Sequence, residues 1–498
     1  MLKNKYIDIT LCLILLIGLG LRLHKLNAPI LDGDSFRQGA TASIARNFYE
    51  GGFNLFNPRI TGWGNINEAG LWPNEFPLYP YVVACLYVPL GEHEWIPRLL
   101  TILFCLAGAA ALYDLVRRYD GALTARFAAL WYLITPQAIY HGRCFHRHPI
   151  AIGLLLIALA VYARWLENRR RSAYIGMTVC GSLALLMMPP LAIIVVPALW
   201  IHKHETGKQA WGNGMLWLCG TIMIVPSLLW YGWAIQQPQS YSLNSLGRET
   251  FRNWTDPSYY MLWWKHDFFR SVWRSLWFYT LGPLGLVLGT LGIFLKRGSL
   301  PRLLIVWVGI IVLYYLIDVH PIIIAPHLVY FLIILAPLSW GAGRATALLW
   351  ESMPEKSVIP IIPMRGLLCA VILVSSIFYW NNMIQPWYRL KHNWLQAAEI
   401  IQNNTPEDAK LIVDEFDPSL IHYTHRMGIT KNTPDITLES VKQLESEGAT
   451  HLAIVNQEAF FKKDALRFHL KDTARNVVIN QFVRLYELGA KHEESKTE

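Results

Sequence analysis

The chain has 498 residues, of which 53% are hydrophobic and only 16% are charged. Because soluble domains carry roughly 25% charged residues, this composition argues against a soluble globular protein and indicates a polytopic membrane protein. The net charge of +9 is not by itself a sign of nucleic-acid binding, and the seven cysteines, which lack a CxxC spacing, predict neither a disulfide framework nor a metal site.

Apolar segments long enough to cross a bilayer recur along most of the chain. A spanning helix needs about 20 mostly apolar residues. On this basis we predict a polytopic α-helical membrane protein with about eleven spans. The segments are 7–25, 95–115, 122–141, 149–166, 173–188, 189–202, 211–233, 276–295, 302–318, 322–340 and 366–384.

Basic residues in the short loops predict the orientation of the chain. With a cytoplasmic N-terminus, Arg117, Arg118 and the basic run 169–171 fall inside, whereas the acids between residues 32 and 94 fall outside. An odd number of spans then places the C-terminus outside.

A long outer loop, residues 26–94, separates the first two predicted spans. Asp32 and Asp34 stand at its start, directly before a stretch in which apolar residues recur every four positions from Phe36 to Phe48. That spacing predicts an amphipathic helix. The later segment "EFPLYPYVVACLYVPLG" is apolar and interrupted by prolines, so we expect a helix that lies at the membrane interface.

The composition becomes that of a soluble domain after residue 384. The segments "AKLIVDEF", "THLAIVN" and "RNVVINQFVRLYEL" predict strands, and "NWLQAAEIIQNN", "TLESVKQLES" and "EAFFKKDALRFHLKD" predict helices. We therefore predict a membrane domain over residues 1–384 and a small extracytoplasmic α/β domain over residues 385–498. The absence of a GxGxxG or P-loop pattern gives no support to nucleotide binding.

The two acids at the start of the outer loop have a structural and a functional interpretation. Asp34 is positioned to cap a helix that begins at Ser35, and Asp32 is positioned to hold a turn with Gly33. A carboxylate beside a polar cavity is also suited to act as a general base toward a hydroxyl group. The two interpretations are compatible.

Further ionisable residues are expected on the same outer side. Glu75 precedes an aromatic, proline-rich run, Arg98 opens the second predicted span, and Arg143 lies at the outer end of the third. Arginine binds oxyanions bidentately, so these two arginines are candidates for binding a phosphate, although snorkelling to lipid headgroups is an alternative. His146 and His148 alone are too few ligands to predict a metal site.

The sequence resembles glycosyltransferase family 39, the protein O-mannosyltransferases and lipid A aminoarabinose transferases that use polyprenyl-phosphate sugars. The resemblance covers most of the chain and rests on "DGDSFRQGATASIARNFYEGGFNLFNPRI", "NEFPLYPYVVACLYVPLGEHEWIPRLL", "YHGRCFHRHP" and "PHLVYFLIILAP". It implies a C-type glycosyltransferase architecture in a bacterial plasma membrane. It also implies inverting transfer of a sugar from a polyprenyl-phosphate donor to a glycolipid, an envelope glycan or a protein on the outer face.

The resemblance implies roles for the acids of the outer loop. Asp34 best matches the family's proposed catalytic base, Asp32 is the alternate, and Glu75 matches a second acid of the loop. Many relatives carry Asp where this chain has Ala40, and an acid where it has His148. These departures keep open a non-catalytic scaffold or partner subunit, and a lipid-linked sugar transporter is a further alternative.

Cationic and polar residues are the candidates for binding the leaving phosphate. Arg98 and Arg143 would stabilise the anion. His327 and Tyr330, one helical turn apart, are expected either to contact the donor phosphate or to form a packed polar pair. The resemblance implies no nucleotide cofactor, and it leaves the need for a divalent cation open.

Overall fold

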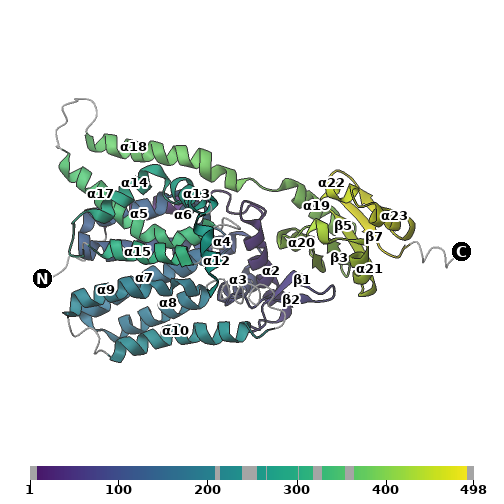
Figure 1. The fold of residues 1–498 in the computed structure, drawn as a ribbon, viewed down its shortest axis with the longest axis horizontal. Coiled ribbons are helices and arrows are strands. Elements are labelled where there is room, and N and C mark those ends of the chain that lie inside the picture. Colours follow the sequence, from purple (N-terminus) through teal and green to yellow (C-terminus); the bar gives the residue numbers. More distant parts are fainter. Residues whose placement is uncertain are drawn as a thin grey trace. The chain divides into compact units, whose positions relative to one another are not determined.

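A computed structural model describes residues 8–207, 214–237, 255–264, 266–300, 302–317, 328–353 and 364–490. The chain divides into two compact units, and Figure 1 shows their elements. The first unit comprises Met1–Leu26, Arg98–Gln236 and Ser242–Trp387. The second unit comprises Asn27–Pro97, Gln237–Tyr241 and Tyr388–Glu498.

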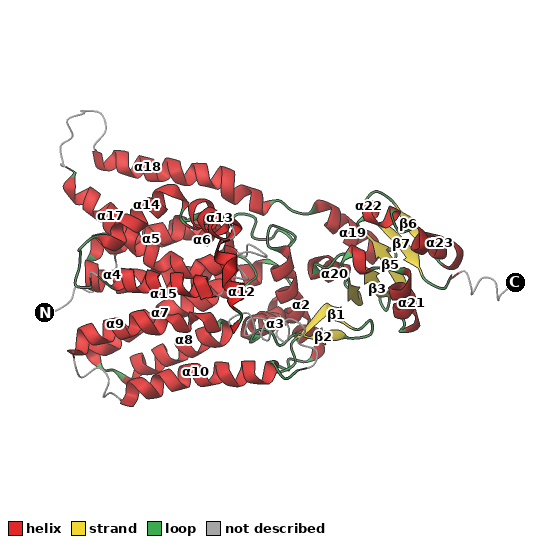
Figure 2. Cartoon of the chain, viewed as in Figure 1, coloured by secondary structure: helices red, strands yellow, loops and turns green. Residues whose placement is uncertain are grey.

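The described part of the first unit is helical (Figure 2). Its longer helices are α1 (Ile9–Arg22), α4 (Trp95–Asp120), α5 (Ala122–Ile134), α7 (Arg147–Asn168), α8 (Arg171–Met187), α9 (Val195–Thr206), α10 (Gly214–Ala234), α13 (His266–Arg274), α14 (Gly282–Phe294), α15 (Leu303–Ile317), α17 (Leu335–Ser352) and α18 (Met364–Tyr379). Shorter turns of helix are α6 (Pro136–His141), η1 (Pro189–Ile194), α12 (Pro257–Tyr260), η3 (Met261–Trp264), η4 (Ser275–Thr280), η5 (Leu328–Ile334), η6 (Trp380–Ile384) and η7 (Gln385–Tyr388).

Several described helices are long and apolar enough to cross a membrane. Five meet this test, or six if the bent pair Phe268–Thr280 and Gly282–Phe294 forms one span. The five are Trp95–Asp120, Arg147–Asn168, Gly214–Ala234, Val329–Ser352 and the helical run Met364–Asn403. Shorter apolar helices, such as α1, α5, α8 and α15, coincide with further predicted segments. The chain is therefore a helical membrane protein, while the number of about eleven spans and the orientation of the termini stay predictions.

Small residues let the helices of this unit pack closely. The helix α17 packs against both α5 and α14, and α8 packs against both α7 and α10 (Figure 1). A Cβ atom added to Gly292 of α14 would lie 1.8 Å from the carbonyl oxygen of Gly341 of α17. The two backbones are therefore in contact at this point, as small residues allow in membrane helix pairs.

A proline divides the predicted segment 122–141 into two helices. The helix α6 begins at Pro136, which has no N–H to continue the hydrogen bonds of α5. The buried Arg22 donates from Nη2 to the carbonyls of Leu133 (3.1 Å) and Ala138 (2.8 Å), and from Nη1 to that of Gly18 (2.8 Å). One guanidinium thus satisfies carbonyl groups on both sides of the break.

The second unit is built on a seven-stranded sheet with the order β2-β1-β4-β3-β5-β7-β6. The strands are β1 (Arg59–Gly64), β2 (Ala69–Leu71), β3 (Lys410–Val413), β4 (Met427–Thr430), β5 (His451–Ile454), β6 (Arg475–Ile479) and β7 (Arg484–Glu487). The helices are α2 (Ser35–Gly51), α3 (Leu78–Leu90), α19 (His392–Asn403), α20 (Pro418–Thr424), η8 (Thr433–Asp435), α21 (Leu438–Ser446), α22 (Gln457–Phe461) and α23 (Asp464–Thr473).

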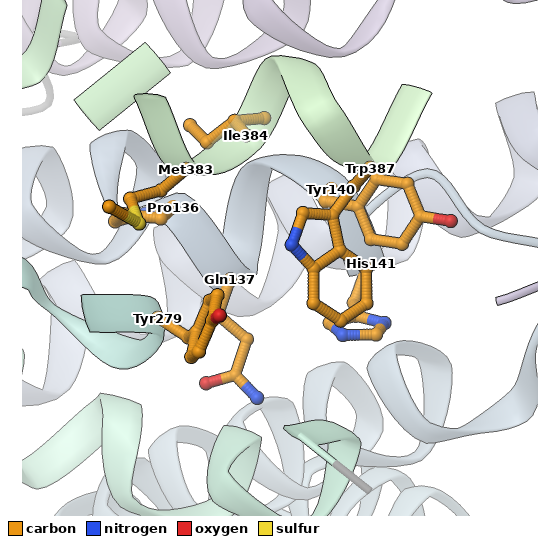
Figure 3. A pocket seen from close by; sticks show the side chains of 8 residues that line it. All are labelled: Pro136, Gln137, Tyr140, His141, Tyr279, Met383, Ile384 and Trp387. Carbon is orange, nitrogen blue, oxygen red and sulfur yellow. The ribbon is translucent and has the colours of Figure 1, made fainter. Parts of the chain in front are cut away.

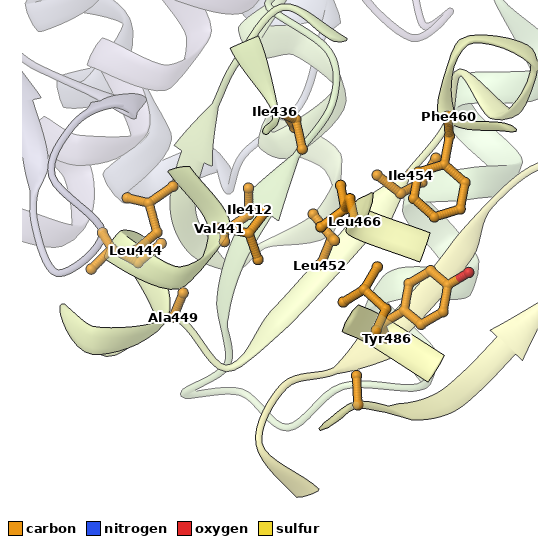
Figure 4. Packing of buried hydrophobic residues seen from close by; sticks show 13 residues of the cluster. Ile412, Ile436, Val441, Leu444, Ala449, Leu452, Ile454, Phe460, Leu466 and Tyr486 are labelled. Atoms are coloured by element: carbon orange, nitrogen blue, oxygen red, sulfur yellow. The ribbon is translucent and has the colours of Figure 1, made fainter. Parts of the chain in front are cut away.

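Alternate residues of the central strands pack into two hydrophobic cores, one on each face of the sheet. Ile412 and Leu452 face a cluster that includes Leu466 and is covered by α21, α22 and α23 (Figure 4). Their neighbours Leu411 and Ala453 face a second cluster with residues of α19 and α20. This two-residue period is the expected consequence of a pleated strand with helices on both faces.

The segments that make up the second unit differ from the predicted domain boundaries. The segments expected to form strands after residue 384 form β3, β5, β6 and β7, whereas α20 and β4 were not predicted. The outer loop contributes the antiparallel β1–β2 pair, and β1 joins β4 in parallel with Gly62 opposite Ile429. Residues 27–97, which the sequence assigned to the membrane domain, therefore belong to the unit that contains the C-terminal strands.

The predicted amphipathic helix is α2. Its apolar residues Ala40, Ile44 and Phe48 are buried in one cluster with Ile60 of β1 and Ala84 of α3. The later apolar segment of the loop also forms a helix, α3.

Candidate functional site: a carboxylate cluster

The two predicted acids lie at the start of α2. Asp32 is buried, and its Oδ1 accepts a hydrogen bond from Nε2 of Gln38 at 2.6 Å. Its carbonyl oxygen accepts from the backbone N–H of Ser35 at 3.1 Å, so Asp32 holds the predicted turn. Asp34 occupies the N-cap position, but its side chain makes no capping hydrogen bond. The capping interpretation of Asp34 is therefore wrong, because its carboxylate points instead toward Arg37, whose Nε lies 3.9 Å away.

A third carboxylate, Asp417, completes the cluster in the second unit. Its Oδ2 accepts hydrogen bonds from Oγ of Ser35 at 2.5 Å and from Nζ of Lys391 at 3.2 Å. Its Oδ1 accepts from the backbone N–H of Ser419 at 2.9 Å, which caps α20. Sequence reasoning missed Asp417, because no local pattern links it to a helix more than 360 residues earlier.

Close packing of two helices makes this arrangement possible. A Cβ atom added to Gly39 of α2 would lie 2.6 Å from Cβ of Ser419 and 2.7 Å from its backbone nitrogen. Only glycine at this position lets α20 approach near enough for Ser35 to bind Asp417.

The environment of Asp34 changes its acidity. The pKa of the Asp34 carboxyl is raised from 3.8 to about 7. Burial is the largest cause, Arg37 opposes the change, and the carboxylates of Asp32 and Asp417 contribute to it. The Asp34 side chain nevertheless keeps 18% of its surface exposed. A partly accessible carboxylate with a pKa near neutrality is suited to accept a proton from a substrate hydroxyl.

Glu75 belongs to the same unit but to another segment. It lies half-buried in the turn between β2 and α3, two residues before Pro77, the N-cap residue of α3. Its predicted role in substrate binding stays a prediction.

The two predicted phosphate-binding arginines lie together in the first unit. Arg98 and Arg143 are fully buried, and their Nη1 atoms both donate to the carbonyl of Lys25, at 3.4 Å and 3.3 Å. Arg98 also donates to the carbonyl of Leu26 at 2.8 Å. A phosphate would have to share Arg98 and Arg143 with these backbone carbonyls. Arg22, the last residue of α1, is a third buried arginine of this unit, but its hydrogen bonds go to other carbonyl groups.

A histidine pair and Tyr330 form another polar group of the first unit. Nδ1 of His148 lies 3.0 Å from Nδ1 of His146, so one ring donates and the other accepts. The ring of Tyr330 meets the His148 ring edge-on at 5.5 Å. His327, the predicted partner of Tyr330, lies outside the described residues. In the described ranges, no three His, Cys, Asp or Glu side chains come close enough together to hold a metal ion.

An aromatic pocket of the first unit is too small for a substrate. Figure 3 shows it between α6, η4 and the segment from η6 to η7, with Tyr140, His141 and Trp387 among its lining residues. The ring centroids of Tyr140 and Trp387 are 5.1 Å apart. The cavity volume of about 10 Å³ is near the lower limit for a single water molecule, so these side chains serve packing.

Comparison with known proteins identifies the family and the folds that this chain resembles. Residues 73–233 match the family described as dolichyl-phosphate-mannose-protein mannosyltransferase. No curated protein matches the chain by sequence. ArnT from Cupriavidus metallidurans bound to undecaprenyl phosphate shares the fold with a TM-score of 0.64 and 16% identity, over 95% of this chain and 97% of that one.

Two other solved structures share the fold. The Archaeoglobus fulgidus oligosaccharyltransferase matches with a TM-score of 0.60 and 12% identity, over 94% of this chain and 71% of that one. The mycobacterial arabinofuranosyltransferase AftD matches with a TM-score of 0.56 and 13% identity, over 98% of this chain and 42% of that one. The chain is thus a membrane protein that shares the fold of these glycosyltransferases, and its predicted resemblance to the protein mannosyltransferases and to ArnT is confirmed.

Proposed function

We propose that this protein transfers a sugar from a polyprenyl-phosphate donor to an acceptor on the outer face of a bacterial plasma membrane, with Asp34 as the general base. The observation that carries this proposal is the raised pKa of Asp34 together with its partial exposure. The carboxyl has a pKa of about 7, and the side chain as a whole remains partly exposed at the start of α2.

The proposed step is a single displacement at the anomeric carbon. The acceptor hydroxyl gives its proton to the Asp34 carboxylate as its oxygen bonds to the anomeric carbon. The bond between that carbon and the phosphate oxygen breaks, and its electron pair leaves with the polyprenyl phosphate. Attack from the opposite side inverts the configuration. Asp32, held by Gln38, is the alternate base.

A lipid-phosphate donor suits the proposed side of the membrane. Nucleotide sugars are cytosolic, so a site on the outer face needs a donor that crosses as a lipid conjugate. ArnT from Cupriavidus metallidurans has been solved with undecaprenyl phosphate, and the Archaeoglobus fulgidus oligosaccharyltransferase with a dolichol-phosphate. For this chain, Arg98 and Arg143 are our candidates for neutralising the leaving phosphate.

Radiolabelled sugar transfer tests the proposal. Membranes containing the chain are supplied with a panel of synthetic polyprenyl-phosphate sugars, and label in membrane acceptors is measured. We expect transfer by the unaltered chain and a loss of roughly 100- to 10,000-fold in Asp34→Asn, the range typical of a missing general base. Glu50→Gln is the matched control, because Glu50 is an acid at the far end of the same helix.

The other outcomes have defined meanings. An active Asp34→Asn variant with an inactive Asp32→Asn variant would move the base to Asp32. Activity in both variants would reject the carboxylate mechanism. No transfer with any donor would favour the non-catalytic alternative and direct attention to Ala40 and His148.

A further inference from the structure

A large groove of the second unit is not used by the proposed chemistry. It has a volume of about 730 Å³ and lies along the β1–β2 pair and the segment that follows β4. Its lining includes Trp63, Trp72, Phe416, Asn65 and Asn432. This size falls in the range of small-molecule sites, which combine aromatic walls with a few polar groups.

The aromatic side chains of the groove form one connected wall. The ring centroids of Trp63 and Trp72 are 4.7 Å apart at 89°, and those of Trp63 and Phe416 are 4.7 Å apart at 53°. Phe416 keeps 37% of its surface exposed and stacks on Phe36 of α2 at 5.7 Å. Rings held at such angles present faces in different directions. Aromatic faces carry partial negative charge, so they attract the polarised C–H groups of a sugar ring.

The charges of the groove balance one another. Its lining has two basic residues, Arg59 and Lys431, and two acidic residues, Glu68 and Asp435. Arg59 pairs with Glu68 at 3.3 Å, and Asp435 accepts a hydrogen bond from Nδ2 of Asn432 at 3.1 Å. Amide and paired charged groups suit hydroxyl ligands, whereas a phosphate or an anionic polymer would need an excess of positive charge.

The aromatic wall contacts the helix that begins after Asp34, because Phe416 stacks on Phe36 of α2. Phe36 lies two residues after Asp34, and Phe416 directly precedes Asp417, which binds Ser35. A ligand that contacts Phe416 in the groove therefore lies one aromatic ring away from Phe36, in the first turn of α2.

We propose that this groove binds a neutral saccharide of the acceptor, so that a hydroxyl of its terminal sugar reaches Asp34. The inference rests on the proposed function, because it names the acceptor of the same reaction as a glycan-bearing molecule. Stacking on the aromatic wall supplies the binding contacts, and Asn65 and Asn432 supply hydrogen bonds to sugar hydroxyls.

Calorimetric titration of the full chain in lipid nanodiscs, free of sugar detergents, tests the groove. The probes are mannotriose, maltotriose and chitotriose as neutral trisaccharides and trigalacturonate as an acidic one. We expect at least one neutral probe to bind, and the affinity to fall on the order of tenfold in Phe416→Ala. Phe468→Ala is the matched control, since Phe468 is an exposed phenylalanine on α23 of the same unit. Asn432→Ala, at an exposed position, gives a second test that leaves the core intact.

The groove and the transferase activity can fail separately. Asp34→Asn should keep saccharide binding while losing transfer. Binding by a chain that transfers no sugar would support the groove and reject the proposed function. Three results would overturn the groove proposal. The first is sugar transfer by a chain that binds none of the probes. The others are unchanged binding in both Phe416→Ala and Asn432→Ala, and tighter binding of trigalacturonate than of the neutral probes.

Discussion

Three carboxylates with different partners meet at the start of α2. Asp32 accepts a hydrogen bond from an amide, and Asp417 accepts hydrogen bonds from a hydroxyl, an ammonium and a backbone N–H. Asp34 has its cation, Arg37, at the longer distance of 3.9 Å. Because burial and like charges disfavour ionisation, the pKa of Asp34 is raised to about 7. Three residues of one type are thus distinguished by their surroundings.

The activity should follow the ionisation of Asp34. A general base acts when it is deprotonated, so kcat/KM is expected to be constant above pH 7 and to fall about tenfold for each pH unit below it. The measurement is the initial rate of sugar transfer at low acceptor concentration between pH 5 and pH 9. A profile that stays flat down to pH 5 would contradict the role of Asp34.

Stability provides an independent readout of the same group. The folded pKa of Asp34 lies above the ordinary value of 3.8, so the folded chain binds this proton more tightly than the unfolded chain. The stability from this group is complete below pH 3.8 and is lost as the pH rises to about 7. Asp34→Asn should therefore raise Tm at pH 8 and leave it unchanged near pH 4, whereas a Tm effect that is independent of pH would argue against the raised pKa.

At the scale of elements, α2 connects the outer loop to the C-terminal part of the second unit. Its apolar face packs on β1 and α3, and its N-terminal turn packs on α20. The β1–β2 pair extends the sheet beside β4. The loop between the first two predicted spans is therefore a structural part of a sheet whose other strands come from the end of the chain.

Gly39 is the residue on which this packing depends most directly. Gly39→Ala would place a methyl group 2.7 Å from the backbone nitrogen of Ser419, so α20 must move. We expect a loss of about 1–3 kcal/mol in the free energy of unfolding, together with reduced sugar transfer. Thermal unfolding of the purified chain and the transfer assay measure the two effects.

Gly51→Ala is the control for this prediction. Gly51 lies in the same helix, and a Cβ atom there would meet nothing within 4 Å. It should leave Tm and transfer unchanged or raise Tm slightly, because alanine favours a helix over glycine. Equal effects of the two substitutions would show that contact with α20 is not the cause.

At the scale of the whole chain, buried charged groups join helices that are distant in sequence. In the first unit, the guanidinium of Arg344 on α17 forms an ion pair with Asp120 at the end of α4, and both side chains are fully buried. Nε1 of Trp340 also donates to Asp120 Oδ2 at 2.6 Å. An ion pair of this kind is costly to break, because removing one partner leaves a buried charge without compensation.

Asp120→Ala should therefore destabilise the chain strongly. We expect a loss of about 3–5 kcal/mol in the free energy of unfolding, seen as a large fall in Tm. Asp114→Ala should cost about 1 kcal/mol or less, because Asp114 pairs with Arg118 and Arg164 in a partly exposed setting. The combined replacement of Asp120 by Leu and Arg344 by Met should recover much of the lost stability. Failure of that recovery would assign the effect to packing around Trp340.

The sequence by itself determined the features that depend on local pattern. Apolar stretches predicted the long apolar helices of the first unit, because a bilayer demands about 20 apolar residues within one segment. The four-residue spacing from Phe36 to Phe48 identified α2, and strand propensity identified β3 and β5. It also nominated Asp32 and Asp34, whose position before a helix is visible in the chain order.

Only the tertiary structure decided which distant groups meet. The hydrogen bond between Ser35 and Asp417, the pairing of Gly62 with Ile429, and the aromatic wall from Phe36 to Phe416 each join residues more than 360 positions apart. The raised pKa of Asp34 has burial as its largest cause, and burial is a property of the folded chain. The nearby Arg37 and Asp32 are visible in the local sequence, whereas the charge of Asp417 is brought to Asp34 only by folding. The sequence specifies the chemical type of each side chain, but the electrostatic environment that gives a carboxylate its role arises when the chain folds.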